Sequence, residues 1–142
     1  MTDIQAAIGR EQLKRLSEII KRRRFLAERY RKLLEDIPGI GLPEEPNWAR
    51  TNWQSYCVRL PDRCDQLKVM QFMLDRDVAT RRGVMCTHRE KAYTDLPCHW
   101  PLLESEKAQD HSILLPLYHQ MTEEDQNYVV VVLMEACKQA SF

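Results

Sequence analysis

A short stretch of the sequence carries several side chains that can bind an anion together. These side chains are Arg81, Arg82, His88, Arg89 and Tyr93. Guanidinium groups bind phosphate through two hydrogen bonds at once. Gly83, in the same stretch, marks a bulge or a close approach of the backbone. The stretch therefore predicts a pocket for a phosphate-bearing ligand, and ordinary solvated arginines are the alternative interpretation.

Other catalytic patterns are missing from the sequence. Four glycines are too few for a phosphate-binding or dinucleotide-binding loop, and no Ser–His–Asp or Cys–His set can be assembled from spacing alone. A zinc site would use Cys86, His88, Cys98 and His99, but their spacing differs from that of paired zinc ligands. Five cysteines, an odd number, favour free thiols in a reducing compartment. We therefore predict no catalytic residue and no metal ligand within the chain.

The charge of the 142-residue chain is balanced overall but uneven along its length. Lys and Arg number 21, as do Asp and Glu, so no basic field points to nucleic acid. Residues 10–36 carry ten basic and five acidic side chains, whereas residues 101–142 carry two and seven. We expect these two segments to attract one another within the fold, and Arg22, Arg23 and Arg24 to form a solvated face.

The longest apolar run, residues 128–134, is far shorter than the roughly 20 residues that span a membrane. The N-terminal residues show no signal-peptide pattern. The sequence therefore predicts a cytoplasmic protein with neither a membrane nor a nucleic-acid partner.

Hydrophobic periodicity and turn residues divide the chain into helices and strands. We expect helices over residues 4–37, 61–77, 105–111 and 122–138, and strands over residues 53–60, 78–85 and 113–118. Pro116 predicts that the third strand lies at an edge or a bulge. This order predicts an α/β two-layer sandwich, in which helices cover a small, mostly antiparallel sheet. Residues 1–38 would form a long connecting helix, and residues 39–142 a small α/β domain.

The first helix is too long for a chain of this size. About 34 helical residues span about 50 Å, whereas a small domain is about 30 Å across. The helix must therefore project, kink, or lie against other protein. Its apolar stripe near Ile4, Ala7 and Ile8 predicts contact outside the chain's own core, including self-association.

Five segments of the sequence resemble a known enzyme family. They are MTDIQAAIGREQLKRL, RRRFLAERYRKLLEDIPGI, SYCVRL, DVATRRGVMCTHREKAY and LLPLYHQMTEEDQNYVVVVL. Together they are similar to the nucleotide-sugar aminotransferases of the DegT/DnrJ/StrS group, which are fold-type I pyridoxal-phosphate enzymes. The resemblance implies the C-terminal small domain of such an enzyme with its connecting helix. It also implies that His88 faces the sugar nucleotide, that Arg81 and Arg82 contact its diphosphate, and that Tyr93 forms a wall.

The resemblance also implies how the whole enzyme works. It would use pyridoxal phosphate to move an amino group, expected from glutamate, to a keto-sugar nucleotide, and it would be a homodimer. The family's Schiff-base lysine and the aspartate that pairs with the pyridine nitrogen would precede Met1. The seven lysines present fall mostly on amphipathic helix faces, whereas a Schiff-base lysine needs burial beside the cofactor. We therefore expect the isolated chain to bind no cofactor and to be inactive.

Two functions of other classes remain open from the sequence. The first is a stand-alone binding or regulatory module that has lost catalysis, which a native start at Met1 would favour. The second is an interaction module that uses the long basic helix as a partner-binding arm, which self-association through that helix would favour.

Overall fold

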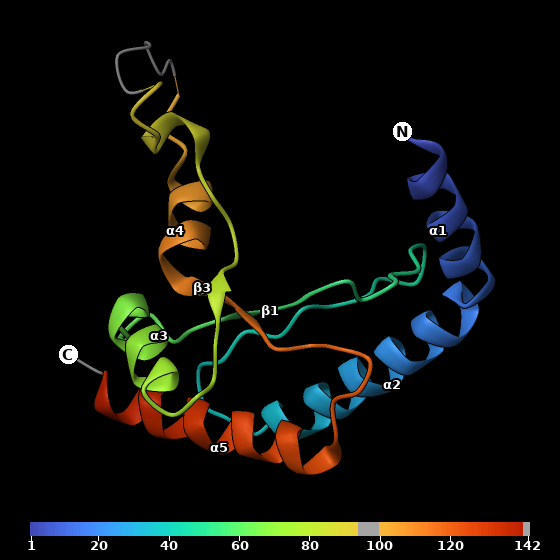
Figure 1. The fold of residues 1–142 in the computed structure, drawn as a ribbon. Helices are drawn as coiled ribbons and strands as arrows, with labels where there is room; N and C mark the ends of the chain where they lie inside the picture. The colour runs from blue at the N-terminus through green and yellow to red at the C-terminus, as the bar shows by residue number, and fades with distance from the viewer. Residues whose placement is uncertain (94–99, 141–142) are drawn as a thin grey trace.

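A computed structural model describes residues 1–93 and 100–140 of the chain (Figure 1). The helices are α1 (Asp3–Lys14), α2 (Leu16–Leu34), α3 (Gln66–Leu74), α4 (Leu103–His111), α5 (Glu123–Gln139) and the short 3-10 helix η1 (Thr87–Arg89). The strands are β1 (Tyr56–Arg59), β2 (Arg81–Arg82) and β3 (Ser112–Leu115). Among the described residues, no helix combines the length and the apolar character needed to cross a bilayer.

Side-chain caps fix where α1 and α5 begin. The Thr122 hydroxyl accepts a hydrogen bond from the Asp125 N–H at 3.1 Å, and the Asp125 carboxylate accepts one from the Thr122 N–H at 2.9 Å. This backbone hydrogen bond lowers the pKa of Asp125 and places a negative charge in the first turn, where the helix dipole favours it. Thr2 and Gln5 form the same capping box at α1. Both helix starts predicted from the sequence are confirmed.

The three strands form an antiparallel sheet in the order β1-β3-β2, in which Val58 pairs with Ile113. Alternate residues of β1 and β3 face the core, because successive side chains of a strand point to opposite faces. The predicted α/β sandwich with a mostly antiparallel sheet is confirmed. The predicted edge position of the third strand is wrong, since β3 is central. Pro116 lies just past its end, where the missing N–H removes no bond from the ladder.

Helices α2, α3 and α5 lie on one side of this sheet, and α5 packs against both α2 and α3 (Figure 1). Gln126 is wholly buried in α5, and its side-chain amide donates to the Leu26 carbonyl of α2 at 3.0 Å. Among the described residues, Cys57, Cys64, Cys86 and Cys137 form no disulfide bond. Among the largest fully buried side chains are Tyr30, Tyr56, Leu26, Leu34, Leu60, Met73, Ile113, Met121 and Leu133.

The predicted single helix over residues 4–37 is instead two helices that meet at Arg15. In α2, Leu26, Tyr30 and Leu34 lie in the core, whereas α1 buries no residue. Figure 1 shows α1 leading away from the sheet and its covering helices. Ile4 and Ile8 are 74% and 59% exposed. The apolar stripe of α1 is therefore free to contact other protein.

The prediction that Arg22, Arg23 and Arg24 form a solvated face is wrong. Arg22 donates to the Met121 carbonyl at 2.6 Å, Arg23 to the Trp53 carbonyl at 3.1 Å and Arg24 to the Thr51 carbonyl at 2.6 Å. Guanidinium groups have several donors in a fixed fork and therefore satisfy loop carbonyls well. These three side chains hold the segments before β1 and α5 against α2.

Candidate functional site

Of the predicted site residues, His88 and Arg89 lie on an arm built from η1 and α4, which projects from the sheet on the side away from α1 (Figure 1). The buried Cys86, at the start of η1, donates its thiol to the Ser105 carbonyl of α4 at 3.1 Å. The Cys86 N–H also donates to the side chain of Gln109. Both bonds fix η1 on α4, and we call this unit the α4 arm.

A cluster of charged side chains joins η1 to α4. His88 Nε2 lies 3.0 Å from Glu106 Oε1, and Arg89 donates to Glu106 at 3.0 Å and to Asp110 at 2.6 Å. The hydrogen bond from His88, followed by that from Arg89, lowers the pKa of Glu106. Because an ionised carboxylate only accepts hydrogen bonds, Nε2 of His88 carries a proton.

The orientation of His88 leaves its second ring nitrogen for another partner. No described residue hydrogen-bonds to Nδ1 of His88, and in a neutral imidazole with a proton on Nε2 this atom is an acceptor. The His88 side chain is 23% exposed. The ring is therefore held in place by Glu106, and its Nδ1 remains available for a hydrogen bond at the surface of the arm.

The other predicted residues do not gather around His88 in one pocket. Arg81 and Arg82 are both exposed and follow one another in β2, so their side chains point to opposite faces of the sheet. Arg82 lines a cavity of about 330 Å³ that Asp65 and Asp110 also line. Tyr93 is 46% exposed and donates its backbone N–H to the Glu90 carbonyl.

The zinc interpretation gains no support from the described part of the chain. Within residues 1–93 and 100–140, no three His, Cys, Asp or Glu side chains are placed to hold a metal ion. Cys86 is buried against Ser105, and His88 is bound to Glu106. Cys98 and His99 lie outside the described residues.

None of the lysines has the surroundings of a Schiff-base lysine in this structure. All seven side chains are exposed. Several contact surface carboxylates, such as Lys14 with Glu11 at 2.6 Å. A lysine that forms a Schiff base needs burial to lower its pKa, so these residues do not fit the covalent attachment of pyridoxal phosphate.

The partners of the predicted site were missed in the sequence. Glu106 and Asp110 lie four residues apart and so share one face of α4, where they bind His88 and Arg89. The sequence did carry a signal for this charged cluster. It consists of two carboxylates four residues apart on a predicted helix, together with the His88-Arg89 pair.

The sequence matches a known protein family over most of its length. Residues 1–134 match the model of the DegT/DnrJ/EryC1/StrS aminotransferase family. The chain is 37% identical over 118 residues to the dTDP-4-dehydro-2,3,6-trideoxy-D-glucose 4-aminotransferase of Saccharopolyspora spinosa, covering 82% of this chain and 29% of that protein.

Two solved structures share the fold over nearly the whole chain. DesI, solved in the presence of its TDP-sugar product, superposes with a TM-score of 0.90 at 25% identity, covering 98% of this chain and 36% of DesI. The putative sugar aminotransferase Spr1654 of Streptococcus pneumoniae, in its PLP form, gives a TM-score of 0.86 at 20% identity, covering 100% of this chain and 37% of that one. The chain thus spans about a third of the length of these relatives.

Proposed function

The chain belongs to the DegT/DnrJ/EryC1/StrS aminotransferase family, and we propose that it is the C-terminal part of a nucleotide-sugar aminotransferase. The whole enzyme moves an amino group, from glutamate, to a keto-sugar nucleotide. The observation that carries the proposal is the family match over residues 1–134, and the coverage of only about a third of the relatives accounts for the lack of a fitting lysine.

Within this part, the α4 arm contributes polar groups to the sugar nucleotide. His88 faces the sugar, because Glu106 fixes its ring and leaves Nδ1 available. Arg81 and Arg82 are exposed in the edge strand β2 on opposite faces of the sheet, so the one that faces the site meets the diphosphate, and Tyr93 forms a wall. Arg89 binds no phosphate, since Glu106 and Asp110 occupy its guanidinium.

Pyridoxal phosphate binds to the remaining part of the enzyme. When bound, it supplies the electron sink for amino transfer. The exposed lysines of this chain do not fit its attachment, so the lysine that holds it and moves the proton lies in the other two thirds of the protein.

We expect the 142-residue chain by itself to form no covalent adduct with pyridoxal phosphate and to catalyse no transamination. The reason is that no lysine is buried in a site that lowers its pKa. The measurement is absorbance of the mixture in the internal-aldimine region, followed by borohydride trapping and mass mapping. A stoichiometric adduct on one particular lysine would overturn the proposal.

The exposed stripe of α1 contacts either the rest of the enzyme or a second copy of it. Burial of apolar surface is worth about 25 cal/mol per Å², and Ile4, Ile8 and Leu13 are each more than half exposed. We expect the chain alone to self-associate reversibly, as sedimentation velocity at increasing concentration would show.

Two sets of variants separate this stripe from the rest of α1. Replacing Ile4 and Ile8 by serine should shift the chain towards the monomer, whereas Arg10→Ser, on another face of the same helix, should not. A strict monomer at high concentration, or equal effects of both changes, would contradict association through α1.

A further inference from the structure

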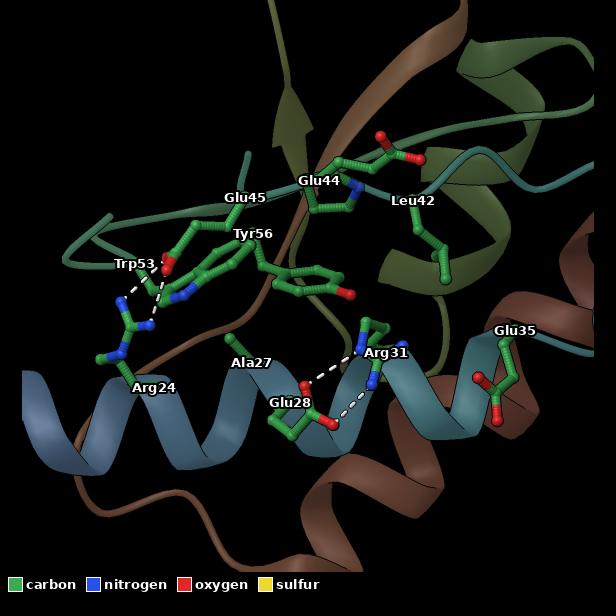
Figure 2. A pocket seen from close by; sticks show the side chains of 11 residues that line it. Arg24, Ala27, Glu28, Arg31, Glu35, Leu42, Glu44, Glu45, Trp53 and Tyr56 are labelled. Carbon is green, nitrogen blue, oxygen red and sulfur yellow. Dashed lines mark hydrogen bonds and ion pairs between the residues drawn. The ribbon is translucent and has the colours of Figure 1, made fainter. Parts of the chain in front are cut away.

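A second cavity, of about 680 Å³, is lined by no residue of the α4 arm (Figure 2). Its floor is the face of α2 around Ala27, and its other walls are the segment before β1 and the start of β1 itself. Trp53 and Tyr56 form an aromatic wall, with ring centroids 5.6 Å apart. Leu42 adds aliphatic surface, so the cavity can hold a carbon skeleton.

The two arginines that line this cavity cannot bind an anionic ligand. Arg24 donates to both carboxylate oxygens of Glu45, at 2.7 and 2.9 Å. Arg31 donates to both carboxylate oxygens of Glu28, at 2.7 and 3.0 Å. Each guanidinium lowers the pKa of its glutamate partner, and these carboxylates are therefore ionised at neutral pH. Both pairs are bidentate, and their positive charge is already compensated.

The charge left over in the cavity is negative. Glu35 and Glu44 also line it, and both are exposed at its rim. No described residue forms an ion pair with either of them. Four glutamates and two arginines thus line the cavity. The net negative charge of this lining repels phosphates and dicarboxylates and attracts cations.

The Tyr56 hydroxyl is a buried polar group that has no hydrogen-bond partner among the described residues. The Tyr56 side chain is 1% exposed, and Figure 2 shows its hydroxyl between Leu42 and Arg31, in the wall of the cavity. Burial raises the pKa of Tyr56 to about 12, so the group stays a neutral hydroxyl that can donate and accept. Buried hydroxyls in proteins almost always have a partner. A ligand in the cavity would supply the missing one.

We propose that this cavity binds a small organic ammonium compound, whose carbon skeleton packs on Trp53 and whose ammonium group donates to the Tyr56 hydroxyl. Aromatic faces attract organic cations, and a second ammonium group meets the rim carboxylates of Glu35 and Glu44. The binding needs neither a cofactor nor the sugar nucleotide, and it is independent of the proposed aminotransferase activity.

The test is calorimetric titration of the chain with putrescine at low salt, compared with the uncharged 1,4-butanediol. We expect putrescine to bind saturably at one equivalent per chain and butanediol to give no saturable heat. Added salt should weaken the putrescine binding, because rim carboxylates and solution ions compete for the ammonium groups.

Three variants test where the diamine binds. Tyr56→Phe keeps the ring and removes only the hydroxyl, and it should weaken putrescine binding by roughly tenfold. Its thermal midpoint should not fall, since the hydroxyl has no partner to lose. Glu44→Gln, at the exposed rim, should weaken binding severalfold with no effect on folding. Glu104→Gln removes a carboxylate from α4 that is also exposed and is the matched control, for which we expect unchanged affinity.

Absence of saturable putrescine binding overturns the proposal, and so does equal binding of butanediol. Equal weakening by Glu44→Gln and Glu104→Gln would show general attraction to an acidic surface and would also overturn it. If Tyr56→Phe does not fold, Glu44→Gln and its control still decide.

Discussion

Replacing Gly83 by alanine is expected to destabilise the protein by about 1–3 kcal/mol, the usual cost of forcing an extra carbon into a packed site. A Cβ at this position would overlap the Ser112 hydroxyl and the Cys57 sulfur. The Gly83 N–H also donates to the Ser112 carbonyl at 3.0 Å, so the backbone cannot move away without losing that bond. Because Gly83 links β2 to the α4 arm, the same change should disturb the position of His88.

The measurement is urea unfolding of Gly83→Ala beside Gly9→Ala. Gly9 lies inside α1, and a Cβ there meets nothing within 4 Å. Alanine is the better helix former, so Gly9→Ala should leave stability unchanged or raise it by up to about 1 kcal/mol. Similar unfolding midpoints for the two variants would show that the close approach at Gly83 is not tight.

Local signals predicted most of the elements. Two helices begin close to the expected residues 4 and 122, where Thr2 and Thr122 form caps that satisfy backbone groups within their own turn. Gly83 was expected to mark a close approach, and Ser112 and Cys57 show what approaches it. The central position of β3 was not predictable from Pro116, because strand order depends on pairing between distant segments. The division at residue 38 stays a prediction, although α2 contributes Leu26, Tyr30 and Leu34 to the core.

The site was less predictable than the fold. His88 was singled out from the sequence, but its partner Glu106 comes from another helix, and only the folded chain brings them together. Likewise, Arg24 and its carboxylate partner Glu45 are distant in the sequence, and only the folded chain brings them together. Arg81 and Arg82 are adjacent in sequence, but the side chains of adjacent residues in a strand point to opposite faces of the sheet.

We propose that these residues complete an aminotransferase whose cofactor is held by the rest of the enzyme. Fusing the chain into a relative provides that missing part. The 4-aminotransferase of Saccharopolyspora spinosa, 37% identical, is suited to this, with its matched segment replaced by the present chain. The inserted chain would restore a wall of the active site and exclude water there. Positioning of this kind accounts for large rate enhancements.

Within such a chimaera, His88→Asn should raise the KM for the sugar nucleotide by about tenfold and leave cofactor loading unchanged. The expected loss corresponds to about 1–3 kcal/mol for a polar partner left without its hydrogen bond. Loss of the cofactor in this variant, or unchanged kinetic constants, would remove His88 from the proposed site.

The most direct test is the rate of amino transfer to the relative's own sugar nucleotide, measured for the chimaera and for the relative with the matched segment deleted. We expect the chimaera to be faster by on the order of a hundredfold or more, with equal loading of pyridoxal phosphate. A folded, cofactor-loaded chimaera that transfers no faster than the deleted relative would contradict the proposal and would favour a stand-alone binding module.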